Sequence, residues 1–381
     1  MKKMLFMGIV ASAAIAMTGC SSDETVLTPS AQGNAIEFGT YLGRDAQMRG
    51  TELTNTTFNK FGVHASYTGA DDFGTSSTPN FMYNQTVSKS EDAWTYTPLK
   101  YWPTTIGDKV SFFAYAPLAA ESNGCLTLST NEATGAPTVT YTYPSDLTQM
   151  VDFVANNQLN LKRTLTGNDV NKVNFTLKHE LTRVNFLAKV SEDVFKSDNA
   201  ANKTKVVITG VKFDNTENFY TKGVYTFDGT TTNTRGTWTF ADADKNALNL
   251  KSILNLGEVK NGSYTNSAGI ALEGTSSVEL FKQTTDSKQN YLFLLPVSGL
   301  TQGDVTVTIN YEIVTADTNL KDGYSITQAE KTVKVPAGYL EVGKAYAFTF
   351  QINVNTVDFT ATVEDWSETP SDITVDYKDQ K

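Results

Sequence analysis

The chain has 381 residues, of which 31 are basic and 41 acidic, and its formal net charge is −10. An acidic surface repels phosphate backbones, so we do not expect nucleic-acid binding. Only two cysteines, Cys20 and Cys125, and two histidines are present, which excludes a disulfide framework and a cysteine-based zinc site.

The N-terminus has the layout of a secretory signal. Lys2 and Lys3 precede an apolar run from Met4 to Ala16, and small residues lead to Gly19. The run is shorter than the ~20 apolar residues that a membrane-spanning helix needs. The next residue, Cys20, resembles the lipid-bearing cysteine of a bacterial lipobox. This resemblance implies cleavage between Gly19 and Cys20, a lipid on Cys20 and an outer-membrane lipoprotein.

The sequence therefore predicts a signal peptide at residues 1–19 and a polar, flexible tether at residues 20–34. The acidic group Ser21–Glu24 resembles a short tag that sends some lipoproteins to the cell surface. The same four residues also fit a solvated linker, and the sequence leaves both interpretations open.

Beyond the tether, the pattern is typical of an all-β protein, because β-branched and aromatic residues recur between closely spaced turn residues. The clearest alternation lies at 35–42, where Ile36, Phe38 and Leu42 would share one face of a strand. Further strands are predicted at 61–67, 109–115, 137–143, 172–177, 182–189, 205–213, 223–227, 237–240, 291–297, 305–314, 331–335, 345–353 and 358–363. Many short strands imply antiparallel sheets packed as β-sandwiches.

The length of the chain predicts at least two domains. The polar interval 156–171 is a weak boundary signal, because the strand after it could still complete the first domain. We place the boundary near Glu180, which gives an N-terminal β-sandwich at 35–180 and a C-terminal β-sandwich at 181–381.

The sequence offers little material for catalysis. His64 lies in an alternating strand and His179 follows one, so we interpret both as structural. No Gly-x-Ser-x-Gly elbow occurs, and Gly338–Ala345 has the spacing of a phosphate loop without its Ser or Thr. We therefore expect a non-enzymatic protein with no catalytic residues, no metal and no cofactor.

Six aromatic-rich segments follow one another along the chain. They are Phe81–Asn84, Trp94–Pro98, Lys100–Pro103, Phe112–Pro117, Phe175–Arg183 and Val363–Trp366. Behind a lipobox, this series resembles the fimbrillin family, the Mfa-like subunits of type V pili, over nearly the whole chain. Aromatic packing in a sandwich core explains the same residues, and it is compatible with the family because these are fold motifs.

The resemblance implies two transthyretin-like β-sandwich domains and assembly with other fimbrial subunits by strand exchange. It also implies that a trypsin-like protease cuts after an arginine near the first strand and so releases that strand. In this sequence the removable strand would carry Ile36, Phe38 and Leu42. Either Arg44 or Arg49 could be the cleaved residue, and we favour Arg49 because it lies further from the strand.

The C-terminal tail at 367–381 has Ile373, Val375 and Tyr377 at alternate positions. It could be the strand that a neighbouring subunit receives, or it could pair with its own domain. Its presence favours a shaft or accessory subunit over a tip subunit.

A second function is also compatible with the sequence. The protein could be a surface-anchored lipoprotein that binds glycans or proteins and never polymerises. Exposed aromatics such as Trp94, Trp102 and Trp238 would then form the binding platform.

Overall fold

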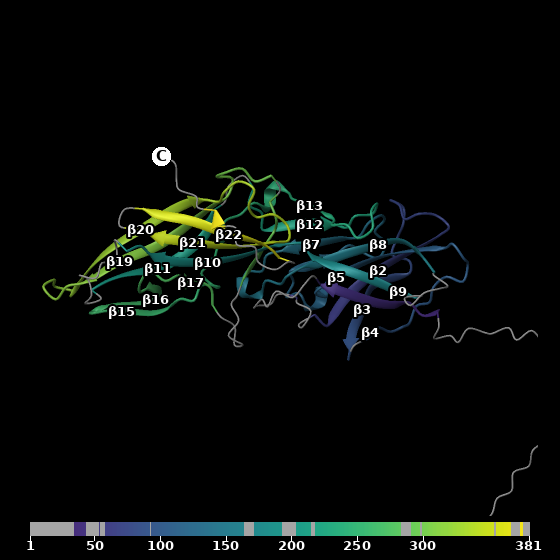
Figure 1. Ribbon diagram of the computed structural model, residues 1–381, viewed down its shortest axis with the longest axis horizontal. Coiled ribbons are helices and arrows are strands. Elements are labelled where there is room, and N and C mark those ends of the chain that lie inside the picture. Colours follow the sequence, from purple (N-terminus) through teal and green to yellow (C-terminus); the bar gives the residue numbers. More distant parts are fainter. Residues whose placement is uncertain are drawn as a thin grey trace, which may run out of the picture.

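The computed structural model describes residues 34–42, 53, 58–91, 93–163, 171–192, 203–214, 218–282, 291–297, 299–353, 356–366 and 374–375. These residues form an all-β structure of four sheets with only short 3-10 turns between strands, which confirms the predicted class. The molecule is elongated, and its two halves lie one after the other along the long axis (Figure 1).

The first half contains two sheets. The β1 sheet has seven strands, in the order β1 (Glu37–Leu42), β9 (Lys172–His179), β8 (Val154–Lys162), β5 (Lys109–Ala116), β2 (Lys60–Gly69), β3 (Met82–Ser90) and β4 (Ala93–Thr95). The β7 sheet has four strands, in the order β13 (Thr237–Thr239), β12 (Lys222–Thr226), β7 (Thr138–Thr142) and β6 (Leu126–Leu128). The two sheets form a sandwich. Phe113 and Phe153, in and beside the β1 sheet, pack on Phe227 and Tyr225, in and beside the β7 sheet.

The second half is also a sandwich of two sheets. The β10 sheet contains β17 (Val278–Glu279), β10 (Thr182–Val190), β21 (Lys344–Ile352), β22 (Val357–Asp365), β23 (Thr374–Val375) and β18 (Leu292–Leu294), which pairs with β10. The β11 sheet contains β15 (Gly257–Asn261), β16 (Tyr264–Leu272), β11 (Thr204–Asp214), β19 (Thr306–Ala316), β20 (Tyr324–Lys334) and β14 (Leu248–Asn249), which pairs with β11. Phe186 of β10 meets Phe213 of β11 across the interior, with ring centroids 5.7 Å apart.

Most strand pairs are antiparallel, as the sequence predicts, but the first strand of each half pairs differently. β1 runs parallel to β9, and β10 runs parallel to β21. Parallel neighbours need long connections, so each of these pairs joins segments that are far apart in the sequence.

The polar interval at 156–171 proves to include most of a strand, β8. Asn156 and Asn157 are buried there, and their amides bind the loop at 228–234. Buried asparagines are stable when they are hydrogen-bonded in this way. The polar composition of the segment does not reveal that they are buried.

The four-stranded β7 sheet combines segments from both sides of the predicted boundary at residue 180. β6 and β7 precede that residue, whereas β12 and β13 follow it and pair with β7. The division into sheets therefore does not coincide with one cut in the sequence.

Candidate functional site

The strand predicted at 35–42 forms β1 and lies at an edge of the β1 sheet. Its parallel register with β9 runs from Glu37 beside Lys172 to Leu42 beside Leu177. On its other side, β1 meets an irregular segment: Ile36 N–H donates to the Lys100 carbonyl at 2.9 Å. An edge strand of this kind can leave while every other strand pair of the sheet stays intact.

The apolar face of β1 fills a groove in the sheet. Ile36, Phe38 and Leu42 are only 1%, 3% and 5% exposed, whereas Glu37 and Tyr41 on the opposite face are exposed. This is the alternation expected for a strand with one buried face.

Four aromatic rings surround Phe38, with centroids 5.2–6.1 Å from its own: Phe61, Tyr96, Phe112 and Phe175. We call this arrangement the aromatic box. The Tyr96 hydroxyl also donates to the Ile36 carbonyl at 2.9 Å, which fixes the strand along its length.

Burial of one such side chain stabilises the folded chain by ~1.5–3 kcal/mol relative to exposure. Without β1, the box and the backbone edge of β9 would both face water. A bare sheet edge beside an apolar groove is a template for another strand.

Most of the other residues predicted for the site lie outside the described residues. They are Gly19, Cys20, Arg44, Arg49, Ile373 and Tyr377. Val375 lies in β23, where its backbone pairs with Ala361 of β22 in the same chain.

The structure contradicts the predicted tryptophan platform at Trp102, whereas Trp94 and Trp238 are half-buried. Trp102 is 5% exposed, and its ring N–H donates to the Asn171 carbonyl at 3.1 Å. The Trp238 ring N–H donates to the Glu180 carbonyl at 2.8 Å, and Trp94 packs on Phe61 with centroids 4.9 Å apart. A sequence pattern cannot separate a tryptophan that binds ligands from one that packs the core.

A polar cluster at the junction of the two halves was not predicted. His179 Nδ1 lies 2.8 Å from Asp152 Oδ2, and the His179 ring stacks on Trp366 at 4.1 Å between centroids. The same Asp152 oxygen accepts from the Leu53 N–H at 3.2 Å. The cluster thus connects the end of β9 and the end of β22 with Leu53, the first described residue after Arg44 and Arg49. The only hint in the sequence is that His179 belongs to the segment Phe175–Arg183.

Next to this cluster, Glu180 is fully buried and pairs with Arg235 at 3.0 Å. Burial raises the pKa of Glu180 to about 7, against the opposing effect of the Arg235 guanidinium. We therefore expect Glu180 to change its charge near neutral pH.

In the described part of the chain, no three His, Cys, Asp or Glu side chains gather closely enough to hold a metal ion. No helix among the described residues is both long and apolar enough to span a bilayer.

These features define the class: an all-β protein of two sandwich halves that carries its first strand as a separate edge element in an apolar groove. The family model described as Fimbrillin-like matches residues 49–366. The chain therefore belongs to the fimbrillin-like family.

Two relatives show the extent of the similarity. The chain is 29% identical to "Fimbrium subunit Fim1C" of Phocaeicola vulgatus over 393 aligned positions, which cover 97% of this chain and 98% of that protein. A crystal structure of a fimbrial protein from Bacteroides vulgatus matches with a TM-score of 0.69 and 26% identity. That match covers 87% of this chain and 99% of the other.

Proposed function

We propose that this protein is a structural subunit, in the shaft or as an accessory, of a type V-like fimbrium at the cell surface, where it contributes to adhesion. Membership of the fimbrillin-like family and the similarity to a fimbrium subunit over nearly the full length support this role. The same family points to a non-enzymatic protein.

The burial of β1 at the edge of its sheet is the observation that supports assembly by strand exchange. The strand is buried through Ile36, Phe38 and Leu42, yet among the described strands it pairs with β9 alone. After its release, a strand from another subunit takes its place in the groove. Because each subunit gives a strand at one place and receives one at another, the contact is head-to-tail and produces an open filament.

A trypsin-like protease releases β1 by cutting after Arg49, or alternatively after Arg44. Both arginines follow the strand within a few residues, and the family match begins at residue 49, so it leaves β1 outside. The signal at 1–19 is removed earlier, and the lipid on Cys20 holds the precursor in the outer membrane. Because Cys20 precedes β1, the lipid leaves together with the strand.

The tail at 367–381 supplies the donated strand. Among the described residues, its pairing within the same chain joins Thr374 and Val375 of β23 to Thr362 and Ala361 of β22. An edge strand can exchange such hydrogen bonds for those of a neighbouring subunit. The tail has apolar side chains at alternate positions, as β1 does, and it takes the place of β1 in the neighbouring subunit. These side chains are Ile373, Val375 and Tyr377.

The test is to treat the purified precursor with a trypsin-like protease and to examine the product by SDS gel electrophoresis without boiling. We expect a single early cut after Arg49 and ladders that resist SDS. Arg49→Ala should abolish the cut and the ladders, whereas Arg44→Ala, the matched control, should not.

A chain that lacks residues 367–381 should be cut normally but should form no ladder. Monomers that persist after complete cleavage of the full chain would overturn the strand-exchange mechanism. They would favour the alternative, a surface-anchored binding lipoprotein that does not polymerise.

A further inference from the structure

The edge of β11 that faces β16 and β14 is interrupted in the middle of the sheet. β16 pairs with β11 as far as Ile208, and β14 pairs with it from Lys212 onward. On the opposite edge the register with β19 shifts between Ile208 and Gly210, so Thr209 is the extra residue of a bulge. In the described strand register, Thr209 therefore has no opposite residue on either edge, as is expected at a β-bulge.

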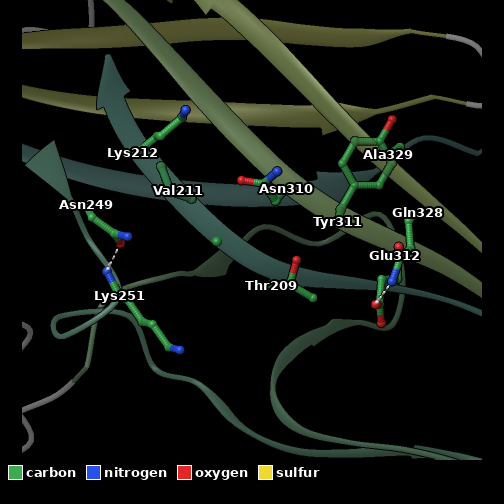
Figure 2. A pocket seen from close by; sticks show the side chains of 11 residues that line it. Thr209, Val211, Lys212, Asn249, Lys251, Asn310, Tyr311, Glu312, Gln328 and Ala329 are labelled. Atoms are coloured by element: carbon green, nitrogen blue, oxygen red, sulfur yellow. Dashed lines mark hydrogen bonds between the residues drawn. The ribbon is translucent and has the colours of Figure 1, made fainter. Parts of the chain in front are cut away.

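A pocket of ≈ 390 Å³ lies over this interruption (Figure 2). Gly210 leaves part of the floor free of side chains, and polar side chains from β11, β19, β20 and the turn after β14 surround it. The principal polar groups belong to Thr209, Asn249, Lys251, Asn310, Glu312 and Gln328. The volume lies within the range of small-molecule sites.

Hydrogen bonds hold the walls of the pocket in place. The Glu312 carboxylate accepts from the Tyr264 hydroxyl, from Asn266 Nδ2 at 3.2 Å and from Gln328 Nε2 at 3.1 Å. Asn310 Nδ2 donates to Glu330 at 2.7 Å, so its Oδ1 is held over Gly210. Asn249 Oδ1 accepts from the Lys251 N–H at 2.9 Å.

The charges at the pocket are largely balanced locally. Lys212 pairs with Asp214 at 3.0 Å, and the Glu312 carboxylate is satisfied by its donors. Beside the Lys251 ammonium, the pocket offers a ligand a set of amide, hydroxyl and backbone groups that includes both donors and acceptors. The interruption spans only the residues between Ile208 and Lys212, which is too short for an added strand.

We infer that this pocket binds an uncharged saccharide residue. Sugar hydroxyls both donate and accept hydrogen bonds, so they match a rigid wall that offers both kinds of group. The pocket lies on β11, β19 and β20, in the half of the molecule opposite to the β1 sheet (Figure 1). Saccharide binding therefore does not depend on strand exchange.

The inference is tested on an array of neutral and acidic saccharides, followed by titration calorimetry of the saccharides bound. We expect neutral saccharides to bind, and both Asn310→Ala and Gln328→Ala to weaken binding about tenfold or more. Gln85→Ala, a half-buried amide in the other half of the molecule, is the matched control and should leave the affinity unchanged. Circular dichroism confirms that each variant is folded.

Three results would overturn the inference: no binding to any saccharide, binding that neither pocket variant weakens, or a preference for acidic saccharides that Lys251→Ala removes. The same variants are also treated with the protease, so that saccharide binding and fimbrial assembly are measured separately. We expect the pocket variants to form ladders like the unaltered chain, so loss of saccharide binding and loss of assembly are scored independently.

Discussion

At the scale of single residues, the aromatic box shows how one side chain can determine whether a strand stays. Phe38 is 3% exposed and touches four rings that belong to β2, β5, β9 and the segment after β4. A cavity in such a place is costly, because neighbours on three strands cannot all relax into it.

Phe38→Ala should lower the free energy of unfolding by about 3–5 kcal/mol. Tyr41→Ala, on the exposed face of the same strand, should change it by less than about 0.5 kcal/mol. Urea denaturation of the uncut protein measures both values. Equal losses for the two variants would show that the buried face of β1 does not hold the strand.

We expect the free energy of unfolding to depend on pH through Glu180. Its pKa is raised from 4.5 to about 7, mainly by burial, so the folded state keeps a proton that the unfolded state releases. Its stabilising contribution is therefore complete below pH 4.5 and is lost as the pH rises through about 7.

Glu180→Gln cannot titrate and should remove this loss. The stability of the variant relative to the unaltered protein should rise by about 3 kcal/mol between pH 4.5 and pH 8. Urea denaturation at a series of pH values tests this, and other titrating groups cancel in the comparison. A difference that stays constant with pH would contradict the assignment.

At the scale of elements, β1 combines a largely buried face with one partner, β9, among the described strands. Its parallel register with β9 is continuous over the six pairs from Glu37 to Leu42. Most of its stabilisation therefore comes from the groove, and any strand with the same alternation could compete for that groove.

A synthetic peptide of residues 34–43, added in excess during protease treatment, should reduce the SDS-resistant ladders in proportion to its concentration. It refills the groove and excludes the incoming strand. The same peptide with Phe38→Ala should be much weaker, because it leaves the aromatic box empty. Equal inhibition by both peptides would mean that the groove does not select the strand.

At the scale of the whole molecule, one core cluster extends through both halves, and a second cluster, which contains Phe38 and the aromatic box, lies within the first half. A single cluster of buried side chains contains Tyr141 and Phe153 of the first half together with Phe186 and Phe348 of the second. The strands β12 and β13 and the stack of His179 on Trp366 add further links across the junction. Halves joined in this way should unfold together.

Calorimetry of the uncut protein should show one unfolding transition. Trp366→Ala should lower its midpoint, since it removes a buried ring stacked on His179 and Phe293 at a cost of about 3–5 kcal/mol. Two well-separated transitions in the unaltered protein would show that the halves are independent domains.

Local patterns predicted much of this structure. Alternation located β1, because a strand with one buried face repeats every two residues, and β-branched and aromatic content located β5, β10, β11 and β19. It missed β8, whose buried asparagines look like a linker, and much of β20, whose side chains are mostly exposed. The sequence also left Trp102 open as an exposed platform residue, although it is buried and its ring N–H donates to Asn171, far away in the sequence.

The sequence by itself determined that the protein is all-β and that its first strand has an apolar face, because both follow from residue type and local spacing. Its aromatic segments resemble the fimbrillin family, and the family match over residues 49–366 shows that the chain belongs to it. Only the tertiary structure decided that β1 lies parallel to β9 in an aromatic box, that β12 and β13 complete the β7 sheet, and that a bulge in β11 opens a polar pocket. The physical reason is that strand partners and register depend on which distant faces fit together, and local propensity does not encode that choice.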